Sequence, residues 1–209
     1  MNLEINNKEN PFDDFKRIAS SLMNDHVLLV GENYYRFTEL EFYYFEKDSH
    51  ADIYSHQHKS QTTSGQWYFH GSGLDITFGS KDVFGGILIR GVKNLKVNKF
   101  INGPILCVQE LFKNLGAINN SEKVSFYIQE LPWDRMGSLI EDQKVYSCQR
   151  VRLRQNKDIP DFRFYNAFYR FFVYPKKEHA NKSIIAENLL AQKFEKETIN
   201  DLFGYKHFK

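Results

Sequence analysis

Residues 34–47 read YYRFTELEFYYFEK, an alternating run of aromatic, polar and charged residues around which the rest of the chain can be arranged. Such a run is typical of a β-strand, in which successive side chains point to opposite faces of a sheet. The alternation places Glu39, Glu41 and Tyr43 on one face and mostly apolar residues on the other. Carboxylates are rarely buried unless they are paired or functional, so this run is either an edge strand with one polar face or part of a site.

Periodicity and turn residues predict the other elements of the chain. Helices are expected over residues 11–24, 103–116 (with Gly116 as the cap) and 181–205. Strands are expected near residues 26–30, 66–70, 74–79 and 84–95, the first pairing with 34–47 as an antiparallel hairpin. Residues 48–65 lack periodicity and are long enough to form a functional loop. The sequence therefore predicts one α+β domain over residues 1–209, with a curved, largely antiparallel β-sheet and flanking helices.

Composition and targeting signals narrow the classes of protein. The 209 residues contain no apolar run of the length that crosses a bilayer, so we expect no membrane partner. The first 15 residues are polar and acidic, unlike a secretory or transit signal. Cys107 and Cys148 lack metal-ligand spacing and are expected to be free thiols in a reducing compartment. These features together predict a cytoplasmic protein.

Positive charge is concentrated in one segment. Residues 144–177 hold nine lysines and arginines against two aspartates, whereas residues 1–60 are acidic. A basic segment is what contact with a phosphate backbone requires, because each neutralised phosphate releases counterions. The alternative is a solvated face that balances the acidic part of the chain.

Two further predicted strands carry residues suited to binding a flat ligand. Tyr68 and His70 share one strand face and could stack on a planar heterocycle, while Trp67 and Phe69 on the other face are expected to be aromatic core. Asp75 follows the next turn, and Arg90 closes an apolar run, where it could anchor a carboxylate or orient a water. Arg90 could equally be a charge at the end of a strand.

The loop histidines allow a different chemistry. His50, His56 and His58 lie within one polar loop, and a glutamate such as Glu41 could complete a metal-ligand set. No HExxH motif or cysteine partner accompanies them. A metal-dependent small-molecule enzyme is therefore one alternative function.

Four segments, taken in order, resemble the hallmark of the alkyladenine (3-methyladenine) DNA glycosylase family. They are Glu39-Leu-Glu41-Phe-Tyr43, Gly65-Gln-Trp-Tyr-Phe-His70, Ile87-Leu-Ile-Arg90-Gly and Gly103-Pro104-Ile-Leu-Cys. Two later segments, Arg150-Val151-Arg152-Leu153 and Tyr169-Arg170-Phe171-Phe172, echo the end of the family pattern. The resemblance covers about residues 27–174 and implies the fold of these glycosylases, which is like the C-terminal domain of formyltransferases.

The resemblance also implies an activity, DNA repair by base excision. Glu41 matches the general base that activates a water, Arg90 matches the arginine that holds that carboxylate, and the carbonyl of Val151 matches a further water ligand. The water attacks C1′ of a nucleotide flipped out of the duplex, and the modified purine leaves without a metal or other cofactor. The base pocket would be formed by Tyr43, His70, Asp75 and either His56 or His50. The expected DNA contacts are Arg150, Arg152, Arg154, Lys157 and Arg163.

One departure from the family pattern keeps a third function open. The family's intercalating hairpin has a large tip residue, whereas residues 70–74 (HGSGL) form a shorter turn in which only Leu74 is large. A relative that binds nucleic acid without excising a base fits this difference. In either case the expected partner is double-stranded DNA with a damaged base, bound by a monomer.

Overall fold

The computed structural model describes residues 1–116, 119, 123–132, 141–155 and 162–208, so Lys157 lies outside the described residues. The helices are α1 (Phe12–Asn24), α2 (Pro104–Phe112), α4 (Arg163–Asn166), α5 (Lys182–Ala191) and α6 (Lys196–Phe203), with a 3-10 turn η1 (Lys59–Thr62). The first strands are β1 (His26–Val30), β2 (Asn33–Glu46), β3 (His50–Ala51), β4 (Trp67–His70) and β5 (Gly73–Thr77). They are followed by β6 (Phe84–Asn94), β7 (Lys99–Asn102), β8 (Phe126–Glu130), β9 (Tyr146–Cys148) and β10 (Arg170–Phe172).

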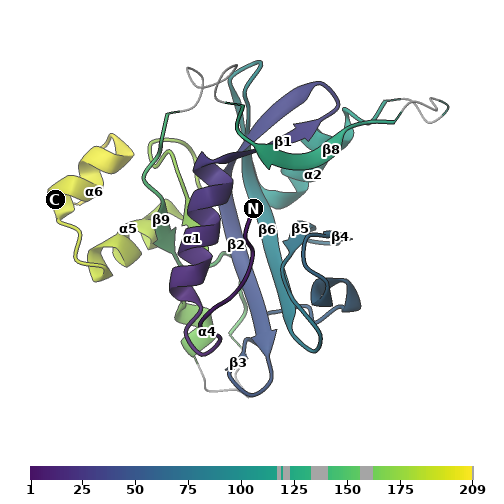
Figure 1. Cartoon of the computed structure of the whole chain (residues 1–209). Helices are drawn as coiled ribbons and strands as arrows, with labels where there is room; N and C mark the ends of the chain where they lie inside the picture. The colour runs from purple at the N-terminus through teal and green to yellow at the C-terminus, as the bar shows by residue number, and fades with distance from the viewer. Residues whose placement is uncertain (117–118, 120–122, 133–140, 156–161, 209) are drawn as a thin grey trace.

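Strand β2 is the centre of the sheet (Figure 1). One edge of β2 pairs with β6 along most of its length, and the other edge pairs in turn with β1, β10 and β3. Glu41, for example, lies between Leu88 of β6 and Arg170 of β10. The interpretation of this run as an edge strand is therefore wrong. All strand pairs within the described residues are antiparallel, and the curled sheet and its helices form one α+β domain.

The alternation in β2 separates the core from the site. Leu40, Phe42 and Tyr44 are buried in the main hydrophobic core, which α1 covers (Figure 1). Phe15 of α1 stacks on Phe42 with ring centroids 4.7 Å apart. Ring pairs of this kind add to the free energy gained by burying apolar area. The opposite face of β2 is thereby left to Glu39, Glu41 and their partners.

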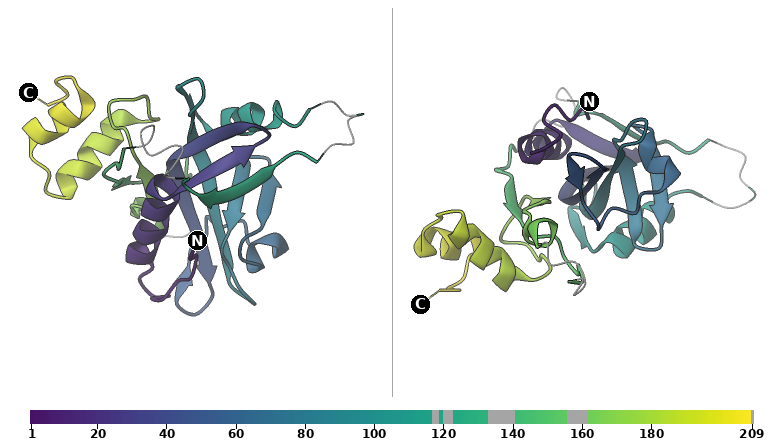
Figure 2. Two further views of the ribbon diagram at one scale, coloured as in Figure 1. Left: turned by 45° about the horizontal axis from the view of Figure 1, so that its top comes forward. Right: turned by 90° about the horizontal axis from the view of Figure 1, so that it is seen from below.

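The C-terminal prediction of one helix over 181–205 is wrong, because the structure has two helices there. Lys193 adopts a left-handed backbone conformation with φ of 66°, which ends α5 and turns the chain. The side chain of Gln192 donates a hydrogen bond to the carbonyl of Ser147 and ties this turn to β9. Figure 2 shows α5 and α6 together at one side of the domain. Their apolar residues form a second core cluster with β9 and β10.

Helix α2 also ends earlier than expected, at Phe112 and not at Gly116. The side chain of Asn114 donates to the carbonyls of Glu110 and Leu111, so the last turn is capped before the glycine is reached. The other predicted helix and strands are confirmed within a few residues at each end.

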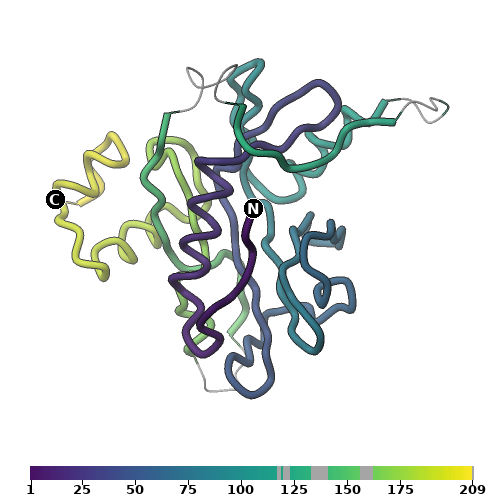
Figure 3. Tube along the Cα trace, viewed as in Figure 1, coloured from purple at the N-terminus to yellow at the C-terminus, as the bar shows by residue number. Residues whose placement is uncertain are grey.

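The N-terminal segment before α1 runs back along that helix (Figure 3). The carboxylate of Asp14 accepts hydrogen bonds from the backbone N–H groups of Asn6 and Asn7, which hold the segment in place. No helix among the described residues is both long and apolar enough to cross a membrane.

Candidate functional site

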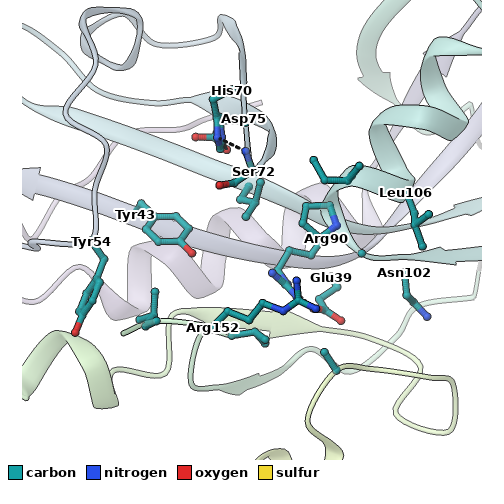
Figure 4. A pocket seen from close by; sticks show the side chains of 18 of the residues that line it. Glu39, Tyr43, Tyr54, His70, Ser72, Asp75, Arg90, Asn102, Leu106 and Arg152 are labelled. Carbon is teal, nitrogen blue, oxygen red and sulfur yellow. Dashed lines mark hydrogen bonds and ion pairs between the residues drawn. The ribbon is translucent and has the colours of Figure 1, made fainter. Parts of the chain in front are cut away.

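A cavity of about 1090 Å³ opens beside the polar face of β2. Its walls come from β2, β5 and β6, from the start of α2, and from residues 151–154 and 178–182. Figure 4 shows Arg90 between its two ends, with Tyr43 and Tyr54 toward one end and Leu106 toward the other. This volume is slightly above the range of about 300–1,000 Å³ that is usual for small-molecule sites.

Glu39 is the anchor of a buried ion network on the floor of the cavity. One carboxylate oxygen accepts hydrogen bonds from Nε of Arg90 at 2.8 Å and Nε of Arg170 at 2.9 Å. The other lies 2.7 Å from Nδ1 of His179. Burial alone would raise the pKa of Glu39, but the charge of Arg170, the hydrogen bond from His179 and the charge of Arg90 lower it overall. Glu39 is therefore a permanently charged and weakly basic carboxylate.

Glu41 lies two residues along the same face and has different partners. Its Oε1 accepts a hydrogen bond from the backbone N–H of Val151 at 2.7 Å, and its Oε2 accepts one from the Tyr43 hydroxyl at 2.8 Å. Nε of Arg90 lies 3.4 Å from Oε1. The side chain of Glu41 has no exposed surface. The structure thus brings together the three residues assigned to catalysis, with the N–H of Val151 directed at the carboxylate.

Tyr43 and Arg90 keep the protonation states that this arrangement needs. Burial, reinforced by the charge of Glu41, raises the pKa of the Tyr43 hydroxyl well above its ordinary range, so the phenol remains a donor. Burial would lower the pKa of Arg90, but the charges of Glu41 and Glu39 raise it overall. Arg90 is therefore positively charged at neutral pH and lies between the two carboxylates.

A hydrogen-bonded chain fixes His70 and Asp75 in the cavity wall. The backbone N–H of Ser72 donates to Nδ1 of His70, which places the ring proton on Nε2, 2.9 Å from Oδ1 of Asp75 (Figure 4). The amide of Gln61 donates to Oδ2 of Asp75. Gly86 lies beneath this pair, and a Cβ there would come within 2.6 Å of both side chains.

Aromatic rings continue from His70 into the loop over residues 48–65. The rings of His56 and His70 meet edge to face with centroids 4.4 Å apart, and both residues line the cavity. Tyr68 stacks on His70 on one side and on His58 on the other. His56, and not His50, is thus the loop histidine that reaches the site.

The prediction that His50 could line the base pocket is wrong. Its ring is 2% exposed and lies 2.9 Å from both the carbonyl of Tyr44 and the hydroxyl of Tyr169, away from the cavity. The loop histidines therefore do not meet as the metal-enzyme alternative requires. Within the part of the chain that the structure describes, no three histidine, cysteine or acidic side chains are grouped as metal ligands.

The prediction that Arg150 contacts DNA is also wrong. Its side chain is fully buried and forms an ion pair with Asp52 at 2.6 Å. It also donates to the carbonyls of Phe42 and Phe164 and thereby joins the loop to β2 and α4. Arg150 is a structural residue that holds the loop beside the site.

The remaining basic residues are exposed. Arg152 and Arg154 line the cavity mouth, and Arg163 lies on α4 outside it. Arg152 has a φ of 61°, a left-handed conformation that residues other than glycine, asparagine and aspartate rarely adopt. Such backbone strain is concentrated at functional sites.

Two residues of the ion network were missed by the sequence analysis. Arg170 lies in an aromatic run that the resemblance quoted, and a lone charge within such a buried strand was the available signal. His179 follows the sheet in a charged segment, KKEHAN, with no motif around it. Only the fold brings His179 to Glu39, across 140 positions of sequence.

Comparisons with known proteins found a distant similarity to an uncharacterised viral protein. No protein-family profile matches it. The chain is 24% identical over 209 residues to "Uncharacterized protein L759" of Acanthamoeba polyphaga mimivirus, a match that covers 84% of this chain and 93% of that protein. That printed name describes no activity, so the function has to be argued from the site.

Proposed function

We propose that the protein is a DNA glycosylase that hydrolyses the N-glycosidic bond of a modified purine flipped out of a duplex. The observation that carries this proposal is the position of Glu41 directly behind a cavity lined by Tyr43, His70, His56 and Arg90: Glu41 does not itself line the cavity, but it contacts both Tyr43 and Arg90. Flipped bases are held by stacking against aromatic side chains, and these rings offer such surfaces. The resemblance across residues 27–174 agrees with this reading.

Glu41 is the better general base of the two glutamates. Glu39 has three strong donors that lower its pKa, and a carboxylate of low pKa accepts a proton poorly. Glu41 accepts hydrogen bonds from a neutral phenol and a backbone amide, which leaves other lone-pair directions of its oxygens for water. Because Glu41 has no exposed surface, the step requires the Tyr43 side chain to turn aside as a base enters.

The reaction then needs only a water and these side chains. Glu41 takes a proton from the water as the water oxygen bonds to C1′ of the sugar. The bond between C1′ and the base breaks, and its electron pair leaves with the base. An alkylated purine carries a positive charge before cleavage and leaves as a neutral molecule. The buried carboxylate of Asp75 in the cavity wall would favour such a cationic base.

An excision assay tests this function. Duplex oligonucleotides containing 3-methyladenine, 7-methylguanine, hypoxanthine or ethenoadenine are incubated with wild type, Glu41→Gln or Glu187→Gln, and abasic sites are detected by alkaline cleavage. Glu187 is exposed on α5 and serves as the matched control. We expect product from wild type and Glu187→Gln, and a rate lower by about 10²–10⁴ for Glu41→Gln, the usual contribution of a general base. Equal rates for wild type and Glu41→Gln would contradict the proposal.

A second function, duplex binding without excision, is favoured by one observation. Leu74, the large residue of the short β4–β5 turn, is 1% exposed and faces the core. The turn therefore offers no large side chain to a duplex. Duplex binding by wild type with no product on any of the four lesions would support this second function.

A further inference from the structure

Two adjacent apolar side chains lie exposed at the rim of the cavity. Ile105 is 45% exposed and Leu106 is 55% exposed, and both line the cavity at the first turn of α2. Single exposed apolar residues are common on protein surfaces. A pair at the mouth of a polar and aromatic cavity, with the cations Arg152 and Lys182 on the same rim, is a more specific arrangement.

The first turn of α2 is a rigid platform for these side chains. The N–H of Gly103 donates to the carbonyl of Arg90 at 2.7 Å, so the helix start is fastened to β6 next to the ion network. Gly103 has a φ of 112°, and Pro104 begins the helix, where its ring fits without loss of a hydrogen bond. A Cβ at Gly103 would lie 3.6 Å from the Leu106 side chain, which leans over the glycine.

The neighbouring β4–β5 turn presents no large apolar side chain at the cavity mouth. Gly71 and Ser72 at its tip are small, and Leu74 is buried. The expectation that Phe69 is a core residue is wrong, because it is 46% exposed on β4; its ring lies against Phe112 and does not line the cavity. Among the residues that the structure describes, Ile105 and Leu106 are therefore the large exposed aliphatic side chains at this mouth, where the other exposed aliphatic residue is the small Ala180.

We propose that Leu106, supported by Ile105, is an apolar wedge that enters duplex DNA and fills the space left by the extruded nucleotide. The inference rests on the proposed function and names the element that opens the duplex. Proteins that distort DNA insert leucine, isoleucine or phenylalanine between base steps in this way. The exposed cations Arg152 and Arg154 on the same mouth complement the phosphates on either side of the wedge.

Single-turnover excision on two substrates tests the wedge. Wild type, Leu106→Ala, Leu106→Met and Leu190→Ala are compared on a lesion in a duplex and on the same lesion in a single strand. Leu190 is 39% exposed on α5 and lies outside the cavity lining, so it is the matched control. We expect Leu106→Ala to lose at least about tenfold more rate on the duplex than on the single strand, because only the duplex has to be opened. Leu106→Met keeps the side-chain volume and should restore most of the rate.

Other outcomes overturn the wedge. An equal loss of rate on both substrates would make Leu106 part of the pocket, and no loss on the duplex would show that it does not open the duplex.

If wild type excises no base, the fluorescence of 2-aminopurine placed in a duplex reports extrusion without chemistry. A fluorescence rise with wild type that Leu106→Ala abolishes supports the wedge although the glycosylase proposal fails. No rise with wild type, or an equal rise with both proteins, overturns the wedge.

Discussion

Glu39 and Glu41 are two residues apart on one strand, yet their partners give them different properties. Glu39 accepts hydrogen bonds from two arginines and lies beside His179, while Glu41 accepts from a phenol and a backbone amide and has Arg90 at the longer distance of 3.4 Å. A carboxylate with several cationic partners stabilises the fold in its charged form and is a poor base. The strand alternation places both side chains on the polar face. Their partners, most of which come from distant parts of the chain, make Glu39 a structural carboxylate and leave Glu41 the better candidate for a base.

The Glu39 network makes stability depend on pH. In the folded protein the pKa of Glu39 is lowered, whereas in the unfolded chain it is expected near its ordinary value of about 4.3. The stabilisation is therefore fully present above about pH 4.3, and it is lost as the pH falls toward the folded pKa, because the unfolded chain then binds the extra proton. We expect Glu39→Gln to be less stable than wild type by about 3–5 kcal/mol at pH 7, since it leaves buried cations without their partner.

Urea denaturation at pH 7 and pH 3 measures this effect. The difference in free energy of unfolding between wild type and Glu39→Gln should shrink at the lower pH. Glu187→Gln, which changes an exposed glutamate on α5, should follow wild type at both values. A difference of the same size at pH 7 and pH 3 would show that the charge of Glu39 is not what the network uses.

Sequence reasoning reached the residues whose position follows from strand alternation, such as Glu39, Glu41 and Tyr43. The alternative that Arg90 is a charge at the end of a strand is wrong, because Arg90 is buried within β6. Sequence reasoning failed where a residue type has two possible environments. Arg150 belongs to a basic segment that predicts a surface, but Asp52 neutralises it in the interior at 2.6 Å. His50 and His56 share one loop, and only its folded path decides which ring reaches the cavity. Contacts between distant segments decide such cases, and spacing along the chain does not encode them.

At the scale of elements, β6 lets the loop over residues 48–65 pack against the sheet because Gly86 has no side chain at the contact. Gly86 faces the hydrogen-bonded pair of Gln61 and Asp75, which are 1% and 2% exposed. We expect Gly86→Ala to destabilise the protein by about 1–3 kcal/mol, because a Cβ would lie 2.5 Å from the Gln61 amide with little free space around it. Thermal unfolding measures this change, and limited proteolysis should cut the loop faster in the variant.

Gly71→Ala is the matched control for that substitution. A Cβ at Gly71 has no atom within 4 Å, so the variant should unfold and resist protease as wild type does. If Gly86→Ala matched wild type in both measurements, Gln61 and Asp75 would have room to separate, and the loop would be held by other contacts such as the Asp52–Arg150 ion pair.

Helices α5 and α6 show that hydrophobic periodicity alone does not predict where a helix ends. A run of apolar residues at helical spacing continues from α5 into α6, but Lys193 turns the chain with a left-handed backbone. The hydrogen bonds of Gln192 to Ser147 hold that turn against β9. A tertiary contact thus overrides a local preference for one long helix.

At the scale of the whole molecule, the described lining of the cavity has two exposed arginines against one exposed carboxylate, that of Glu178. Arg152 and Arg154 lie there, while the buried cations behind them are neutralised by Glu39 and Asp52. We expect Arg152→Ala and Arg154→Ala each to weaken duplex binding and to reduce the slope of log K against log salt concentration by about 1, because each loses one phosphate contact. Fluorescence anisotropy with a labelled duplex across a series of salt concentrations measures both quantities.

Lys81→Ala is the control for these rim variants. Lys81 is exposed in the turn between β5 and β6 and does not line the cavity, so its removal should leave the slope unchanged. Equal slopes for wild type, Arg152→Ala and Arg154→Ala would mean that DNA does not bind across this mouth.

The long reach of the Glu39 network sets the order in which the molecule can be completed. Arg90 follows Glu39 by 51 positions, Arg170 by 131 and His179 by 140. During synthesis the strand that carries the carboxylates emerges long before the last residues that neutralise them, so the nascent chain holds two acidic groups on a half-built sheet. Contacts of such sequence separation slow folding, because the entropy of closing the loop between them is lost before they form. The ion network beside the cavity therefore cannot close before residues 170 and 179 have been synthesised, and the aromatic core, to which Tyr169 and Phe171 belong, is completed by the same late segment.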